Sequence, residues 1–176
     1  TITIKGRENY NYTIKNDKYE IEENIEIEPF KHKLFDRDVF TYDNNKIKII
    51  HSHIINNKIP AVLILENNTT YGRNIIPGKK YTLKNQAKMF YKCVPNDPNL
   101  PSFLVPYEIK TLGFSKIQSN LYVTIEFIKW EDKHPIGVIS QIIGSVDIID
   151  NFYEYQLYCK DLNHSITKFN KKTMCN

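Results

Sequence analysis

The sequence predicts an all-β protein: two small antiparallel β-barrels in tandem, at residues 1–53 and 54–176, the second ending in a helix. Three observations predict this fold class. Isoleucine and aromatic residues alternate with polar residues over short stretches, which is the pattern of strands with one buried face. Turn-forming residues separate these stretches. One stretch near the C-terminal end repeats its apolar residues at helical spacing.

The first half opens with three stretches that predict strands, TITIKG, NYNYTIK and KYEIEENIEIE. In the first and third, isoleucine alternates with polar residues, so we expect one buried face that includes Ile2, Ile4, Ile21, Ile25 and Ile27. Asn16 and Asp17 predict a hairpin tip. The stretch FKHKLFDRDVF predicts an irregular crossing or a helical turn with basic side chains, and a strand at residues 46–51 follows it.

The second half begins after residues 53–58, which are the best candidate for a domain boundary. An apolar strand is predicted at residues 59–66, and Asn, Thr, Gly and Pro residues then predict a long loop at 67–80. A strand at residues 87–94 leads into the proline-rich turn PNDPNLPS. The next stretch, FLVPYEIK, contains Pro106, which favours an edge strand or a bulged one.

The last third predicts a strand, a bent strand and a helix. Residues 121–129 alternate, Trp130 closes the strand, and EDKHP predicts a turn. The next strand, at residues 136–143, contains Gly137, and a glycine inside a strand usually marks a bulge or a tight bend. Asp147 or Asp150 is expected to cap a helix within residues 147–162, which accounts for the acidic DIID tract without a metal ion.

Composition limits the classes of function. The net charge of +4 permits a polyanionic partner without demanding one. No apolar run approaches the length of a membrane span and no signal peptide opens the chain, so we expect no membrane association. The three cysteines are widely spaced without a CxxC motif, which favours a reducing environment in the cytoplasm, the nucleus or a virion.

A series of short motifs runs from Tyr91 to Leu162: a P-x-D-x-x-x-P turn, a strand ending in tryptophan, a P-x-G motif, a glycine and a Glu-containing helix, marked by Pro95, Asp97, Pro101, Trp130, Pro135, Gly137, Gly144 and Glu154. In order and spacing this series resembles the second cold-shock domain of the ribonuclease II/ribonuclease R superfamily, above all its eukaryotic exosome-exonuclease branch. The stretches RENY and FKHKLFDRDVF resemble pieces of the first cold-shock domain.

This resemblance implies two tandem OB-fold barrels and binding of single-stranded RNA. Two departures from the family stand out. The family's turn carries a basic residue where this chain has Pro98 or Asn99. The family's Mg²⁺-binding aspartate cluster, which belongs to a further catalytic domain, has no counterpart here. We therefore expect no catalysis by this chain alone, and exoribonuclease activity only where the protein continues into such a domain.

Candidate RNA-binding residues follow from how OB-type barrels work: exposed aromatic rings stack on bases while cations track the phosphates. Tyr91 and Tyr122 are better surface candidates than Phe90 and Phe127, and Trp130 is expected to be a packing residue. The predicted RNA-binding set is Arg73, Lys79, Lys80, Tyr91, Lys92, Tyr122 and Lys129.

Other chemistry finds little support in the sequence. His51 and His53 share a strand face, but no third ligand stands nearby, so a solvated pair is the preferred interpretation. His32 and His134 lie in basic loops, where phosphate contact and solvation are equally expected. No nucleophile triad, phosphate-binding loop or dinucleotide motif exists, and no cofactor or metal is expected.

Two functions remain open. The first is a non-catalytic, RNA-binding OB module of, or derived from, a ribonuclease II/R-type 3′-to-5′ exoribonuclease. The second is a catalytically dead derivative that binds protein partners, for example in a viral particle or an RNA-processing complex.

Overall fold

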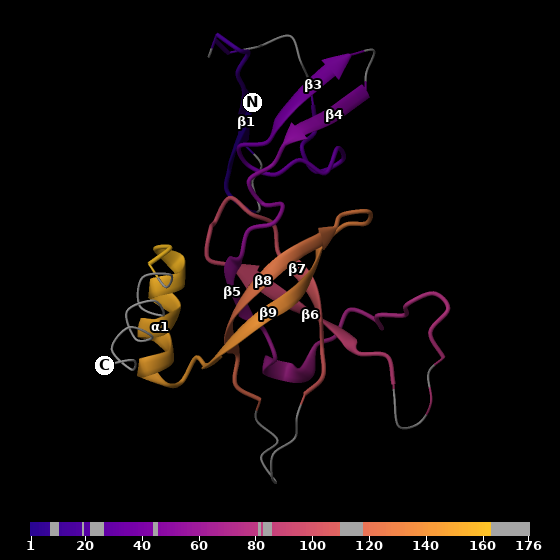
Figure 1. Cartoon of the computed structure of the whole chain (residues 1–176), viewed down its shortest axis with the longest axis vertical. Coiled ribbons are helices and arrows are strands. Elements are labelled where there is room, and N and C mark those ends of the chain that lie inside the picture. The colour runs from indigo at the N-terminus through magenta and orange to yellow at the C-terminus, as the bar shows by residue number, and fades with distance from the viewer. Residues whose placement is uncertain are drawn as a thin grey trace, which may run out of the picture.

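The computed structural model describes residues 1–7, 11–18, 20–21, 27–43, 46–80, 82, 86–109 and 118–162. Within these residues the chain forms an N-terminal module, made by residues up to 53, and a closed barrel beside which one helix lies (Figure 1). The predicted β-rich fold with a single C-terminal helix is confirmed at this level. No helix among the described residues is long and apolar enough to cross a membrane.

The N-terminal module contains two antiparallel hairpins. β1 (Ile2–Lys5) pairs with β2 (Asn11–Ile14), and β3 (Val39–Asp43) pairs with β4 (Lys46–His51). Its core consists of Ile2, Ile4, Ile14, Ile27 and Leu34. The described part of residues 1–53 thus holds two two-stranded sheets, and the first antiparallel barrel that the sequence predicts is not found there.

Details of this module both support and correct the sequence-based expectations. The side chain of Asn16 accepts hydrogen bonds from the Lys18 and Glu20 amides at 2.9 and 3.0 Å, so the predicted hairpin tip is confirmed. Ile21 is 62% exposed, so its predicted burial is wrong, whereas Ile27 is buried as predicted. Ile25 lies outside the described residues. β3 was not predicted, because residues 39–43 lack a clean alternation.

The second half forms a closed five-stranded barrel. Its strands are β5 (Ile59–Leu63), β6 (Met89–Pro95), β7 (Phe103–Tyr107), β8 (Leu121–Lys129) and β9 (Ile136–Ser145). The strand order around the barrel is β5-β6-β7-β9-β8, and a short 3₁₀ helix, Glu66–Asn68, follows β5. Every neighbouring pair is antiparallel except β7 and β9, which are parallel and meet at Leu104 and Ile136. This arrangement is compatible with an OB-fold.

β7 lies inside the closed barrel, so the edge position suggested by Pro106 is wrong. The Leu104 amide donates to the Pro135 carbonyl at 2.9 Å, on the β9 side of the strand. Alternate residues of a strand direct their amides to the same side, so residue 106 faces β9 as well. The pairing of β7 with β9 does not extend to residue 106, so the absence of an amide hydrogen in Pro106 removes no hydrogen bond between these strands.

Gly137 lies opposite a bulge, as predicted. The pairing of β8 with β9 shifts register between Phe127 and Lys129, beside the partner Gly137. A Cβ atom at Gly137 would approach the Glu126 carbonyl oxygen to 3.0 Å and the Phe103 ring to 3.3 Å, so the close packing favours glycine there. β9 continues through Gly144 to Ser145, two residues beyond the predicted end.

Helix α1 (Ile149–Cys159) lies within the predicted range and packs on β8 and β9. The predicted aspartate cap is wrong. Ile148 occupies the N-cap position without a side-chain cap, and Asp147 instead exchanges hydrogen bonds with the Ser145 hydroxyl. Asp150 lies in the first turn, where its charge favours the positive end of the helix dipole.

The N-terminal module packs against one end of the barrel. Phe35 and Ile54 belong to the barrel's hydrophobic core. The Phe35 ring centroid lies 6.0 Å from Phe103 and 4.7 Å from Trp130. The core of the barrel therefore includes residues from both sides of the predicted boundary.

Candidate nucleic-acid interface

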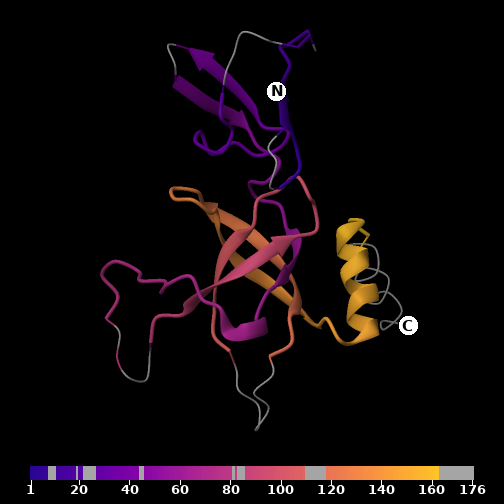
Figure 2. The same ribbon diagram turned by 180° about the vertical axis from the view of Figure 1, so that it is seen from behind.

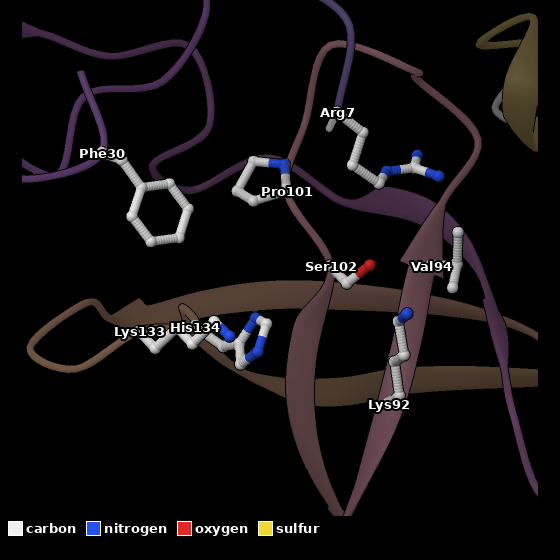
Figure 3. A pocket seen from close by; sticks show the side chains of 8 residues that line it. All are labelled: Arg7, Phe30, Lys92, Val94, Pro101, Ser102, Lys133 and His134. Carbon is white, nitrogen blue, oxygen red and sulfur yellow. The ribbon is translucent and has the colours of Figure 1, made fainter. Parts of the chain in front are cut away.

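A cleft of about 560 Å³ lies where the outer face of β6 meets the β8–β9 turn (residues 130–135) and the N-terminal module (Figure 3). Side chains from five segments line it: Arg7, Phe30, Lys92, Val94, Pro101, Ser102, Lys133 and His134. None of these described lining residues is acidic. Lys92 and Lys133 form no ion pair with the described part of the chain. The cleft therefore offers unpaired positive charge beside apolar surface.

The alternation of β6 places Lys92 in the cleft. Tyr91 and Cys93 face the barrel interior, so Lys92 and Val94 face outward and are half-buried. Lys133 and His134 come from the β8–β9 turn, which is the predicted EDKHP turn. β6 and β7 are the second and third strands of the barrel, and the β8–β9 turn joins its fourth and fifth.

Lys33 of the N-terminal module holds the β8–β9 turn in place. Its ammonium group donates a 2.6 Å hydrogen bond to the Asp132 carbonyl oxygen. The same ammonium lies 5.7 Å from the Phe30 ring centroid and 5.6 Å from that of Trp130. The two rings meet edge to face at 5.4 Å. These contacts fix the turn, and with it Lys133 and His134, against the module.

Arg7 shapes the opposite wall of the cleft. Its guanidinium donates hydrogen bonds to the carbonyl oxygens of Leu100, Pro95 and Asp97 at 2.8, 2.6 and 2.9 Å. The adjacent Gly6 amide donates to the Asn99 side chain at 3.1 Å. Arg7 thus holds the proline-rich turn, the one that lacks its own basic residue, and adds a positive charge at the end of β6.

His134 lies in an environment that disfavours its charged form. Burial lowers its pKa below the usual value for histidine, and the charge of Lys133 lowers it further. Hydrogen bonding with the Ser102 backbone raises the pKa, and the charge of Lys92 lowers it by the smallest amount. The imidazole ring lies 6.5 Å from the ring of Tyr71, centroid to centroid. Tyr71 belongs to the β5–β6 loop (residues 64–88), so the two loops that flank β6 meet at this pair.

Part of the β5–β6 loop runs beside β6. The Tyr71 amide donates to the Phe90 carbonyl at 2.9 Å, and the Phe90 amide donates to the Gly72 carbonyl at 2.8 Å. Arg73 forms a backbone bridge with Met89. Further out, the Lys79 amide donates to the Ile76 carbonyl around Pro77 and Gly78, whose φ is 79°, as in a type II turn.

Both flanking loops project from the side of the barrel opposite α1, as the two views agree (Figures 1 and 2). Arg73, Lys79 and Lys80 are exposed in the β5–β6 loop, and the backbone of Arg73 pairs with Met89 of β6, the strand that carries Lys92. These four cations of the predicted set therefore lie on β6 and on the loop that precedes it. Their contact with RNA stays a prediction.

The two predicted stacking rings both contact other aromatic rings of the protein. Tyr91 is 6% exposed and faces the barrel core, with its ring 6.3 Å from that of Tyr107. Tyr122 stacks on Tyr155 of α1 at 4.3 Å, on the helix side of the barrel. The expectation that Tyr91 lies on the surface is wrong, because its ring belongs to the barrel core. Tyr122 is half-buried, and its ring is already stacked against α1.

Lys129 lies outside the cleft, where its ammonium pairs with Glu131 at 2.6 Å. Conversely, the sequence analysis missed Tyr71 and Lys133 and assigned no binding role to Phe30 or Arg7. The charged EDKHP turn carried the signal for Lys133, as a lysine in a turn beside a strand end. Nothing local could show that Arg7 and Phe30, far away in the sequence, complete the same cleft.

A second cleft, of about 730 Å³, lies between the N-terminal module, the proline-rich turn and the end of α1. Its lining contains both positive and negative side chains. The Arg37 guanidinium pairs there with the Asp97 carboxylate at 3.6 Å and lies 3.5 Å from Nε2 of His53. Burial lowers the pKa of His53, as does the charge of Arg37. No group of three potential metal ligands occurs in the described part of the chain.

Comparisons with protein-family models, with curated proteins and with solved structures found no match for this chain.

Proposed function

We propose that this chain binds single-stranded RNA with little sequence preference, across the outer face of β6 between the β5–β6 loop and the β8–β9 turn. One observation carries the proposal: the cleft on this face contains Lys92 and Lys133 and no acidic residue among its described lining. OB-folds bind oligonucleotides on the face of their second and third strands, flanked by the loops between strands one and two and strands four and five. The cleft occupies the corresponding place on this barrel.

The proposed interface combines two kinds of contact. Lys92 and Lys133 bind phosphates within the cleft, and Arg73, Lys79 and Lys80 extend the positive surface along the β5–β6 loop. The ring of Tyr71, which is 43% exposed, replaces Tyr91 as the stacking ring. The resemblance to ribonuclease II/R-type cold-shock domains supports RNA as the ligand, in a module that binds without catalysis.

A titration of internally labelled oligo-U followed by fluorescence anisotropy tests the proposal. We expect binding that weakens with salt, because each neutralised phosphate releases counterions. Lys92→Gln should weaken binding about fivefold and flatten the salt dependence, whereas Lys48→Gln, an exposed lysine of β4, should change neither. The proposal would be refuted if the wild type does not bind oligo-U at low salt, or if Lys92→Gln and Lys48→Gln lower the affinity equally.

Protein assembly is the second candidate, and one observation favours it. Ile149 and Tyr153, which lie four residues apart on α1, are each 62% exposed, and α1 lies on the side of the barrel opposite the β5–β6 loop (Figure 1). If the chain fails to bind RNA, sedimentation of the wild type beside an Ile149→Ser, Tyr153→Ser variant tests self-association through this surface. A lower sedimentation coefficient for the variant would support assembly.

A further inference from the structure

The cleft is blocked at one end. β6 runs from Met89, beside the β5–β6 loop, to Pro95, whose carbonyl oxygen accepts a hydrogen bond from Arg7. A strand that follows β6 in this direction therefore meets the N-terminal module. Figure 3 shows Phe30, Pro101 and Arg7 along this end, with Lys92 on the opposite side of the cleft.

The blocking wall is held by contacts between the two halves of the chain. Arg7 donates to three carbonyl oxygens of the proline-rich turn, and Lys33 donates to the Asp132 carbonyl across the junction. The ring of Phe30 packs edge to face against Trp130. A wall with this many crossing contacts is not displaced at low cost, so the interior of an RNA strand has no straight path through it.

The polar groups in the cleft suit a phosphate that carries more than one negative charge. Lys92, Lys133 and His134 lie close enough together that the charges of both lysines lower the pKa of the imidazole. The Ser102 hydroxyl also lines the cleft. A phosphodiester carries one negative charge, whereas a terminal phosphate carries close to two at pH 7 and presents three acceptor oxygens.

We propose that the cleft binds the end of a single-stranded RNA that carries a terminal phosphate, in preference to the interior of a strand. This inference rests on the proposed RNA binding and adds its selectivity. The terminal phosphate lies between Lys92 and Lys133, and the terminal nucleotide packs against the Phe30 and Pro101 wall. The rest of the strand leaves along β6 toward Tyr71 and the β5–β6 loop.

The test compares four unlabelled oligo-U molecules of about ten nucleotides by isothermal titration calorimetry. They carry a 5′-phosphate, a 3′-phosphate, hydroxyl groups at both ends, or a circular backbone. We expect one phosphorylated form to bind about tenfold more tightly than the hydroxyl-ended form, which is the effect of about one hydrogen bond to a charged group. The two phosphorylated forms show which end enters the cleft.

Variants locate the effect. Lys133→Gln should abolish the preference for the phosphorylated end, and Lys48→Gln should retain it. Phe30→Leu, which shortens the wall, should bring the circular RNA closer to the linear forms. A preference that survives Lys133→Gln would place the terminal phosphate elsewhere and overturn the inference. If all four RNAs bind equally, RNA binding stands and end recognition is refuted. If none binds at low salt, the proposed function fails and the inference fails with it.

Discussion

Single residues decide what the outer face of β6 can bind. Lys92 has no carboxylate partner in the described part of the chain, whereas Lys129, on a strand of the same barrel, is paired with Glu131. The two lysines look alike in the sequence, since each lies close to an aromatic residue in a strand. Surface ion pairs are weak, but they lower the positive potential that attracts a phosphate. Lys92 is therefore the stronger candidate for binding.

Two tyrosines should separate stability from binding. Tyr91→Ala empties part of the barrel core and should lower the free energy of unfolding by about 3 kcal/mol. Tyr71→Ala should leave stability nearly unchanged and weaken oligo-U binding, because the exposed ring of Tyr71 is the stacking candidate. Urea denaturation and RNA titration of both variants check this. A Tyr91→Ala protein that keeps its stability but binds oligo-U weakly would instead support the sequence-based prediction that Tyr91 stacks on RNA.

Two histidines give stability a pH dependence. Burial lowers the folded-state pKa of both His53 and His134, so the unfolded chain takes up protons first as the pH falls through about 6.5. The free energy of unfolding should therefore be greater at about pH 7.5 than at about pH 5.5. Urea denaturation at the two pH values measures the difference, and a His53→Gln, His134→Gln variant should show a smaller one. If the variant shows the same difference between the two pH values as the wild type, titratable groups other than these two histidines cause the pH dependence of stability.

At the scale of elements, alternation in the sequence predicted the strands of the barrel well. Residues 121–129 alternate over their length, and the strands predicted at 121–129 and 136–143 agree with β8 and β9 to within two residues. Prediction from the sequence failed where a contact between distant segments decides whether a residue is exposed or where its strand lies. Alternation predicts that Tyr122 is exposed, but α1 packs against its ring. Pro106 suggests an edge strand, but β9 pairs only with the start of β7, so a proline is tolerated inside the barrel.

The β8–β9 turn is the element whose position depends most on the N-terminal module. Lys33→Met removes the hydrogen bond to the Asp132 carbonyl oxygen, so the turn should no longer hold Lys133 and His134 over β6. We expect oligo-U affinity to fall about fivefold, the equivalent of one hydrogen bond. Lys31→Met is the matched control, because Lys31 is an exposed lysine paired locally with Glu28. Equal affinities for the two variants would show that Lys33 does not position the turn.

At the scale of the whole molecule, the two halves share a core. Phe35 and Ile54 are packed with barrel residues, and Arg7 ties the first strand region to the proline-rich turn. The sequence indicated two separate barrels because alternation reports only the local burial of each strand. It carries no signal for Phe35, which lies in an irregular stretch and becomes a core residue only when the barrel end is present.

The shared core predicts a single unfolding transition. Circular dichroism, which reports on the whole chain, and the fluorescence of Trp130, which lies at the junction, should change together in urea. Phe35→Ala should lower the free energy of unfolding by about 3–5 kcal/mol and keep the two curves coincident. Two separate transitions in the wild type would mean that the module and the barrel fold independently.

The most direct test of the central claim is a map of where RNA binds, obtained from the amide resonances of the protein as oligo-U is added. We expect the largest shifts at Lys92, Lys133 and His134, with smaller ones at Tyr71 and Arg73, and unchanged resonances along α1. Shifts centred on α1 or on the β3–β4 hairpin, with Lys92 and Lys133 unaffected, would contradict this account.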